Sequence, residues 1–390
     1  MKIVIVGGGF GGVRTALALA NKKNIEVKLI SDQSYFEYHA ALYRSATGRS
    51  PLEVAIPLSE FFSYAKNVEV IEDKIIKINE AEQRVIGQST STYGYDALVL
   101  ATGNVTEYFG VKGLKEFAYG VKTIQEALKL KRHLHDQLLN AESERNYVVI
   151  GAGATGVELS AELTSYLKKI RQKHKIKHSF TVDLIEAGPR VLASMPKKFS
   201  SKVERRLKKL GVKTIFNTAV KAENVDDIQL PKGSIASHTV IWTAGVGNNS
   251  LFAENSKLFE FGKAGRAKVD QYLRTAPNIY VIGDSAVTKY TGMAQTALHD
   301  ANFVASNLIR TSKGQSTSPY KPKRPIYAIP VGPRWAAVLW GETEIYGRLG
   351  WLLRRLADLK LYLLFLPARK AVTTWRYGFK DEEVCPVCKK

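Results

Sequence analysis

Two stretches of the chain carry the pattern Gly-x-Gly-x-x-Gly between an apolar run and a helix-forming run. The glycines are Gly7, Gly9 and Gly12 in the first stretch and Gly151, Gly153 and Gly156 in the second. In such a pattern the first glycine permits a tight turn, the second lets a pyrophosphate approach the backbone, and the third lets helix and strand pack closely. The free N–H groups and positive dipole of the helix N-terminus then attract phosphate. The sequence therefore predicts two βαβ units that bind dinucleotides.

An acidic residue closes the second strand of each unit. Asp32 follows the predicted strand 25–30, and Glu186 follows the predicted strand 181–185. A carboxylate at this point accepts hydrogen bonds from the ribose of a dinucleotide. Glu186 favours NAD over NADP because a 2′-phosphate would meet its charge, although Arg190 lies four residues further on. A glycine-rich turn without a ligand is the alternative, but strand, helix and acid stand in register in both units.

Three further segments have the pattern of buried strands that end in small residues or in a carboxylate. Open α/β sheets bind ligands at the carboxyl ends of their strands, so these ends are candidate cofactor contacts. They are Ala101, Thr102 and Gly103 after residues 95–100, Ala244 and Gly245 after residues 240–243, and Gly283 and Asp284 after residues 278–282.

Composition and charge narrow the class of protein. The 390 residues are 45% hydrophobic and 24% charged, as in a soluble globular protein of two to three domains. No apolar run approaches the roughly 20 residues of a membrane-spanning helix. A strand pattern that starts at Lys2 leaves no room for a signal peptide, and two cysteines indicate a reducing cytosol. The net charge is +21, with +1 in residues 1–150, +12 in 151–316 and +8 in 317–390, which predicts an anionic partner.

The first 310 residues or so, with these five motifs in order, resemble the two-dinucleotide flavoprotein reductases. In that group the first unit binds FAD, the second binds the nicotinamide cofactor, and the acid of the Gly-Asp motif, here Asp284, bonds the ribityl chain. Residues 1–384 contain no cysteine. Disulfide reduction and sulfide oxidation at the flavin are therefore excluded, since both need cysteine sulfur beside it.

Further segments resemble the type II NADH:quinone dehydrogenases. They are residues 35–43, 101–110, 154–159, 186–192 and 293–297. The ferroptosis-suppressor quinone oxidoreductases are also similar, both in the sequence Ala40-Ala41-Leu42 within residues 35–43 and in their short C-terminus. The resemblance implies an FAD enzyme that takes hydride from NADH and passes two electrons to a membrane quinone without pumping protons.

The same resemblance implies the cofactor contacts. For FAD they are Gly7, Gly9, Gly11, Gly12, Asp32, Ala101, Thr102, Gly103, Gly283, Asp284, Ala294 and Gln295. For NADH they are Gly151, Gly153, Gly156, Glu186, Ala244 and Gly245.

Glu158, Gln295 and His299 are the candidate catalytic residues. Glu158 lies in the first turn of the second unit's helix, where the helix dipole alone would stabilise a carboxylate. The resemblance places it where flavin, nicotinamide and quinone meet. His299 stands where the family's Ala-Gln segment has a second glutamine, and a histidine can donate a proton as well as a hydrogen bond. A purely structural histidine is the alternative.

The C-terminal residues 317–390 have a different character. A helix over 350–366 places leucines on one stripe, with Arg354, Arg355, Asp358 and Lys360 mainly off it. The stripe comprises Leu349, Leu352, Leu353, Leu356, Leu359 and Leu363. Leucine stripes usually pack into a core, but one flanked by Arg, Lys, Trp and Tyr also suits a helix lying on an anionic membrane. A lipid-soluble quinone favours the membrane interpretation.

Cys385 and Cys388 form one Cys-x-x-Cys pair near the C-terminus. The pair supplies two of the four ligands of a structural zinc. Either the thiols are free in a reduced tail, or the two chains of a homodimer share a metal ion. We favour free thiols and expect no metal.

The predicted architecture is an α/β chain with two Rossmann-like domains. An FAD domain, 1–112 and 265–316, is interrupted by an NAD(H) domain, 113–264, and residues 317–390 form a small membrane-association region. We expect a peripheral enzyme at the cytoplasmic face of the cell membrane.

Two other functions fit the same motifs. One is a soluble reductase of a ferredoxin or other protein acceptor, whose basic surface docks an acidic partner. The other is a non-enzymatic NADH-sensing flavoprotein that binds nucleic acid through residues 168–213. The basic run 168–177, expected in a loop after the helix, is most simply a solvated helix end. We therefore expect no nucleic acid.

Overall fold

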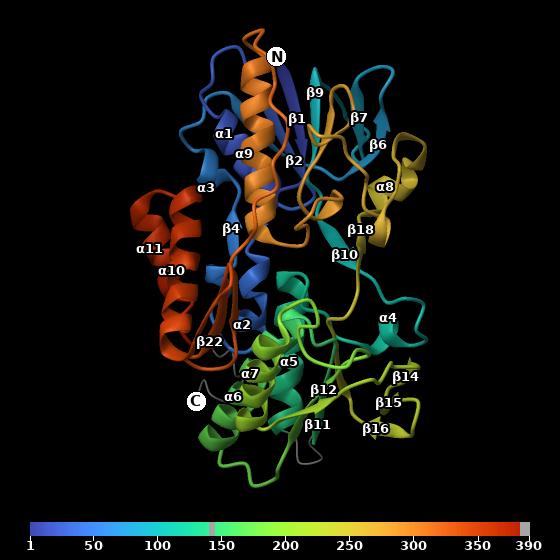
Figure 1. Cartoon of the computed structure of the whole chain (residues 1–390), viewed down its shortest axis with the longest axis vertical. Helices are drawn as coiled ribbons and strands as arrows, with labels where there is room; N and C mark the ends of the chain where they lie inside the picture. Colours follow the sequence, from blue (N-terminus) through green and yellow to red (C-terminus); the bar gives the residue numbers. More distant parts are fainter. Residues whose placement is uncertain (140–144, 383–390) are drawn as a thin grey trace.

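A computed structural model describes residues 1–139 and 145–382. Two units, each centred on a parallel sheet, lie one above the other along the long axis, and a C-terminal region flanks both (Figure 1). The predicted fold class, with two Rossmann-like units, is confirmed.

The first unit has a six-stranded sheet of order β19-β20-β9-β1-β2-β5, parallel except for β19. Its strands are β1 Lys2–Val6, β2 Glu26–Ser31, β5 Val68–Glu72, β9 Ala97–Leu100, β19 Arg274–Ala276 and β20 Ile279–Val281. Alternation along β1 decides its two faces, since successive side chains of a strand point to opposite sides. Ile3 and Ile5 pack under the helices α1 (Phe10–Leu19) and α9 (Ala294–Thr311), while Val4 and Val6 pack under a small antiparallel sheet.

The second unit repeats this plan with a four-stranded parallel sheet of order β13-β12-β11-β17. Its strands are β11 Asn146–Ile150, β12 Thr181–Ile185, β13 Val212–Ile215 and β17 Thr239–Trp242. The helices that cover one face are α5 Ile124–Leu139, α6 Ala154–Lys173 and α7 Lys197–Leu210. The four-residue helix α4 (Leu114–Phe117) and the sheet β14-β15-β16 cover the other face.

The short elements complete the two units. They are β3 Tyr35–Glu37, η1 His39–Ala41, α2 Leu42–Ala46, η2 Pro51–Glu53, β4 Ala55–Pro57, α3 Ser59–Phe62, β6 Ile75–Asn79, β7 Arg84–Gly87, β8 Thr92–Gly94, β10 Asn104–Thr106, β14 Ala222–Glu223, β15 Asp227–Gln229, β16 Ser234–Ala236, β18 Val246–Asn248, α8 Ser250–Glu254, η3 Ser256–Leu258, η4 Lys263–Gly265 and η5 Gly283–Ser285. The antiparallel pair β10 and β18 carries the chain between the units.

Two details differ from the expectations. The basic run expected in a loop is partly helical, because α6 continues to Lys173 before the chain turns at Lys175. Helix α8 packs with Phe259 against the sheet of the first unit, although residues 113–264 were assigned to the second. We propose that the second unit ends near Asn248, where β18 leaves it.

The C-terminal region joins the two hydrophobic cores. Its antiparallel sheet consists of β21 Tyr327–Pro330, β22 Ala336–Trp340 and β23 Thr343–Tyr346, and its helices are α10 Gly347–Phe365 and α11 Ala368–Tyr377. Ile329 and Leu339 of the sheet pack with the second unit, whereas Tyr362 and Phe365 of α10 pack with the first. The strand β23 and the helix α11 were not predicted. None of the helices in the described ranges is both long and apolar enough to cross a bilayer.

Candidate functional site

The first glycine motif has the geometry of a nucleotide cradle. Gly7 adopts a φ of +115°, and a Cβ built on Gly12 would stand 1.9 Å from the Gly7 carbonyl oxygen, so neither position accepts a side chain. A Cβ on Gly9, by contrast, would meet nothing within 4 Å. The middle glycine therefore leaves open space at the N-terminus of α1, as a pyrophosphate would need.

The second motif repeats this geometry. Gly151 has a φ of +98°, and a Cβ on Gly156 would lie 1.8 Å from the Gly151 carbonyl oxygen. Gly153 again faces space without an atom within 4 Å. Both cradles thus fit a dinucleotide, and both lie at the carboxyl ends of the strands of their sheets.

The acids after the second strands differ in how they are held. Asp32 is exposed at the end of β2. Glu186 is fixed by its own loop, because its carboxylate accepts the backbone N–H groups of Ala152 and Gly188, both at 2.7 Å. The guanidinium of Arg190 donates to the carbonyls of Leu192 and Ala193. Among the described residues, no ion pair joins Arg190 to Glu186.

Asp284 is held at the carboxyl end of β20. Its two carboxylate oxygens accept the Asn104 side-chain amide at 2.6 Å and the Gly292 N–H at 3.1 Å. Asp300, fully buried on α9, accepts the N–H of Gly283 at 3.0 Å and so fixes the turn that presents Asp284. Burial raises the pKa of Asp300, and hydrogen bonds from Tyr320 and Gly283 oppose this rise. Sequence reasoning missed Asp300, which lies just beyond the predicted cofactor segment 293–297.

The other small residues predicted at strand ends also meet at this edge. The Ser285 hydroxyl donates to the Gly103 carbonyl at 2.8 Å and lies 3.3 Å from the Thr102 hydroxyl. In the second unit, Gly245 lies so close to the Glu107 carbonyl that a Cβ would be 1.9 Å from its oxygen. The structure therefore brings the predicted strand ends together within each unit.

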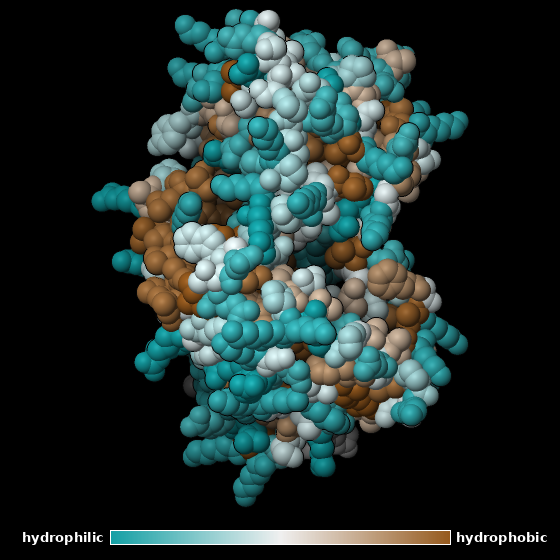
Figure 2. Space-filling model, in the orientation of Figure 1, coloured by the Kyte–Doolittle hydropathy of each residue, from teal (hydrophilic) through white to brown (hydrophobic). Residues whose placement is uncertain are grey.

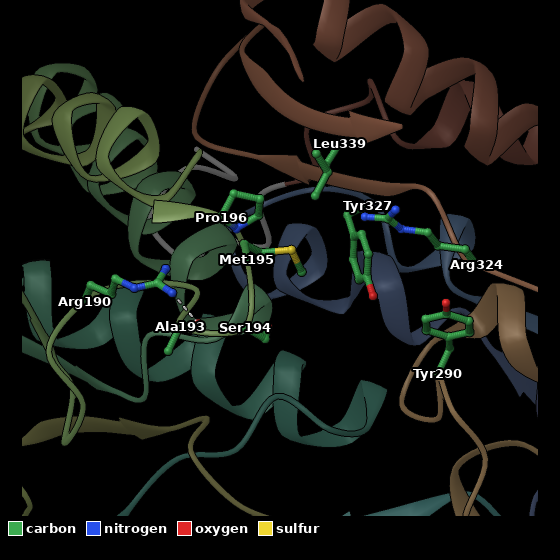
Figure 3. Close-up of a pocket in the computed structure, with 9 residues that line it drawn as sticks. All are labelled: Arg190, Ala193, Ser194, Met195, Pro196, Tyr290, Arg324, Tyr327 and Leu339. Atoms are coloured by element: carbon green, nitrogen blue, oxygen red, sulfur yellow. Dashed lines mark hydrogen bonds between the residues drawn. The ribbon is translucent and has the colours of Figure 1, made fainter. Parts of the chain in front are cut away.

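A cavity of about 570 Å³ opens where the three parts of the chain meet (Figure 3). The loop after Glu186 forms one wall, and Tyr290 with the start of the C-terminal region forms the other. Its lining residues are Arg190, Ala193, Ser194, Met195, Pro196, Tyr290, Arg324, Tyr327 and Leu339. The lining residues therefore come from the second unit, the first unit and the C-terminal region.

Glu158 lies on α6, partly buried, among charges from the other two regions. Burial raises its pKa to about 7, and the positive charges of Arg354 and Arg44 limit the rise, while Asp358 adds to it. A carboxyl group with this pKa exists in both protonation states near neutral pH, so it can take up and release a proton.

Gln295 and His299 both face the chain that enters the C-terminal region. The Gln295 amide donates to the Ile326 carbonyl at 2.7 Å and accepts the Ile326 N–H at 3.0 Å. His299, one turn further along α9, bonds the Lys321 carbonyl through Nε2 at 2.8 Å. Both predicted residues thus hold residues 321–326 against α9, and each keeps one further N–H or ring nitrogen for another partner.

The charges of α10 point into the protein and form a buried network that sequence reasoning missed. Asp358 is fully buried and pairs with Arg44 at 2.7 Å, with Arg355 at 3.1 Å and with Arg354. Burial alone would raise the pKa of Asp358, but the three arginines hold it below its usual value. Glu53 accepts Arg44 at 2.5 Å and Arg355 at 2.9 Å. No local pattern indicates this network, since the pairs that join Arg44 to Asp358 and Glu53 to Arg355 span 314 and 302 residues of sequence.

Four of the six stripe leucines of α10 lie at the surface as a consequence, and Leu353 and Leu359 are half-buried. Leu349, Leu352, Leu356 and Leu363 are between 47% and 59% exposed. Figure 2 shows hydrophobic residues gathered at the left side of the molecule, where α10 and α11 lie in Figure 1. The interpretation of the stripe as a core-packing face is therefore wrong. Cys385 and Cys388 lie outside the described residues, so the alternatives of free thiols and a zinc shared by a homodimer stay predictions.

Known proteins share this fold over nearly the whole chain. The structure titled NDH2 from Plasmodium falciparum in complex with NADH has a TM-score of 0.87 at 19% identity and matches over 97% of both chains. The type II NADH:quinone oxidoreductase Ndh of Mycobacterium tuberculosis is 30% identical over 408 residues, which are 97% of this chain and 88% of that protein. The type II NADH:quinone oxidoreductase of Staphylococcus aureus is 27% identical over 344 residues, which are 82% of this chain and 85% of that protein.

The family model of the pyridine nucleotide-disulphide oxidoreductases matches residues 1–301. This range ends within α9 and contains both glycine cradles and the Gly-Asp turn. The resemblance found in the motifs is thereby confirmed. The chain belongs to the pyridine nucleotide-disulphide oxidoreductases and, with its relative at 30% identity, to the type II NADH:quinone oxidoreductases.

Proposed function

We propose that this chain oxidises NADH and reduces a membrane quinone, with FAD in the first cradle and NADH in the second. The observation that carries the proposal is the pair of matched cradles, each with an open middle glycine, in a member of the type II NADH:quinone oxidoreductases. Bound FAD supplies a two-electron carrier that accepts hydride from NADH and passes the electrons on. The overall reaction, NADH + quinone + H⁺ → NAD⁺ + quinol, consumes one proton.

The residues of the chain bind and orient the two cofactors. Gly7, Gly9, Gly11, Gly12 and Asp32 would hold the pyrophosphate and ribose of FAD, with Asp284 toward the ribityl chain. The fixed carboxylate of Glu186 would receive the ribose hydroxyls of NADH and exclude a 2′-phosphate. We expect kcat/KM for NADH to exceed that for NADPH.

Protons for the quinol must pass through side chains or water. Glu158, with a pKa near 7, can hold such a proton between the second unit and α10. His299 is the other candidate, since its ring lies on α9 one turn from Gln295. We propose that both residues act in the quinone step.

We also propose that the domain boundaries follow the sequence prediction, apart from the end of the second unit near Asn248.

Separate measurement of the two half-reactions tests the function. In stopped-flow experiments without oxygen, NADH should bleach the bound flavin, and a water-soluble quinone should restore its absorbance. Failure of the quinone to reoxidise the flavin, with rapid reoxidation by ferredoxin, would support the protein-acceptor function instead. No bleaching by NADH would contradict the assignment of the second cradle.

We propose further that α10 rests on the membrane as a peripheral anchor at the cytoplasmic face. The supporting observation is its inverted arrangement, with leucines outside and charges inside. Exposed apolar side chains on a surface helix gain about 25 cal/mol for each Å² removed from water. An anchor of this kind would bring the cavity and α9 close to a quinone dissolved in lipid.

Point substitutions test the anchor better than truncation, because Tyr362 and Phe365 belong to the core of the first unit. The triple variant Leu352→Ser, Leu356→Ser, Leu363→Ser should lose most binding to anionic vesicles while it keeps its flavin. Val225→Ser, which removes an exposed apolar side chain from the second unit, is the control. Unchanged vesicle binding of the flavin-loaded triple variant would exclude α10 as the anchor.

A further inference from the structure

The segment 119–124 crosses from the second unit to the first. Tyr119 extends the second sheet, since its N–H donates to the Val240 carbonyl at 2.8 Å and its carbonyl accepts the Trp242 N–H at 2.9 Å. Five residues later, the N–H of Ile124 donates to the Glu37 carboxylate of the first unit at 2.8 Å. The residues between them therefore lie at the junction across which electrons pass from one cofactor to the other.

Lys122 lies in the middle of this crossing. Its backbone N–H donates to the Glu126 carboxylate at 2.6 Å, and the Thr123 N–H donates to the same oxygen at 3.2 Å, so the turn before α5 is fixed. The charges that act on its ammonium are Asp284, Glu126 and Glu37, in that order. The ammonium therefore lies within electrostatic range of Asp284 at the carboxyl edge of the first sheet.

Each of these three carboxylates already has another partner. Asp284 accepts Asn104 and Gly292, Glu126 accepts the turn, and Glu37 accepts Ile124. Within the described ranges, the Nζ of Lys122 has neither a hydrogen bond nor an ion pair of its own. Burial lowers the pKa of Lys122, and the carboxylates, Asp284 first, oppose this effect. A half-buried ammonium without a direct partner is free to interact with a bound ligand.

We propose that the Lys122 ammonium faces the isoalloxazine ring of bound FAD and stabilises the negative charge that the ring gains on reduction. The proposal rests on FAD in the first cradle. In that arrangement Asp284 would contact the ribityl chain, and the isoalloxazine ring, which is attached to that chain, would lie beyond it. A ring that accepts a hydride gains two electrons and one proton, so its charge becomes more negative by one. A positive charge in this position favours the reduced form.

Sulfite provides a test that needs neither NADH nor quinone. Its sulfur adds to flavin N5 with its own electron pair, so negative charge moves into the ring without any oxidant or reductant. We expect Lys122→Gln in the purified holoprotein to weaken sulfite binding about tenfold or more, and to lower the midpoint potential of the flavin. Lys122→Arg keeps the charge and should stay near the parent in both. Lys115→Gln, at an exposed position on α4, is the control for loss of a lysine.

If Lys122→Gln does not retain FAD, the variant Glu37→Gln provides a second test. Glu37→Gln keeps an acceptor for the Ile124 N–H but removes one negative charge near the ammonium, so sulfite should bind more tightly. If flavin-loaded Lys122→Gln has the sulfite affinity and midpoint potential of the parent, the proposal is overturned. If Lys122→Gln is flavin-free, an unchanged sulfite affinity in Glu37→Gln overturns it instead. Failure of NADH to reduce the parent flavin would contradict the proposed function alone, because the sulfite titration still reports on Lys122.

Discussion

Burial and two arginines act in opposite directions on the carboxyl group of Glu158. Burial dominates and brings the pKa to about 7, whereas Arg354 and Arg44 keep it from rising further. These arginines come from α10 and α2, so the protonation of a residue in the second unit depends on the other two regions. The residue that we propose for proton transfer is therefore tuned by the arrangement of the whole chain rather than by its own helix.

Glu158→Gln should change stability in a pH-dependent way. The folded pKa lies above the ordinary value of about 4.5, so the folded state binds the proton more tightly and loses this stabilisation as pH rises from about 4.5 through 7. At pH 8 the variant should therefore be more stable than the parent by about 1 to 3 kcal/mol, and at pH 4.5 this gain should vanish. Urea unfolding at both pH values measures the difference. Glu116→Gln, at an exposed position, should show no such pH dependence.

His299→Gln tests the second proton candidate. The glutamine amide can still bond the Lys321 carbonyl, so α9 and bound FAD should be unaffected. Flavin reduction by NADH should stay near the parent rate, whereas reoxidation by quinone should slow, because a glutamine amide cannot donate a proton. Stopped-flow measurement separates the two steps. Parent-like reoxidation at every pH would mean that the proton comes from water.

At the level of elements, local patterns predicted the two cradles and their strands, because a glycine motif and its acid lie within about 35 residues. Local patterns could not predict which side of α10 faces the core. Its leucine period predicts a helix, but the partners that draw its charges inward lie some 300 residues earlier. They are Tyr38, the Ala40 carbonyl, Arg44 and Glu53. Lys122 was missed for the same reason, since Glu37 and Asp284 lie far from it in the sequence.

Asp358→Ala should destabilise the protein strongly. The substitution leaves Arg44, Arg354 and Arg355 buried, with Glu53 as the remaining acid that pairs with Arg44 and Arg355. Removing one partner from a buried ion cluster lowers the free energy of unfolding by about 3 to 5 kcal/mol. The urea midpoint of the flavin-loaded protein measures the loss. Lys360→Ala, an exposed position on the same helix, should change the midpoint little. Equal midpoints for the two variants would contradict a stabilising role for the cluster.

At the level of the whole molecule, the C-terminal region cannot be a detachable anchor. Its sheet completes the core of the second unit, and α10 completes that of the first. Arg354 and Asp358, on the inner side of the same helix, act electrostatically on Glu158 together with Arg44 of α2.

The net charge of +21 determines how binding to a membrane should depend on salt. Arg354 and Arg355 are neutralised inside the protein, so attraction to lipid must come from the remaining basic residues, each worth roughly 1 kcal/mol near an anionic leaflet. Raising salt from about 0.1 M to about 1 M shortens the Debye length from roughly 10 Å to 3 Å, and binding to anionic vesicles should fall steeply. Weak binding to zwitterionic vesicles should remain, because the exposed leucines do not depend on salt. Sedimentation with both kinds of vesicle measures the two contributions. Equal binding to both at low salt would show that the leucines act alone, and that the positive charge of the protein serves another partner.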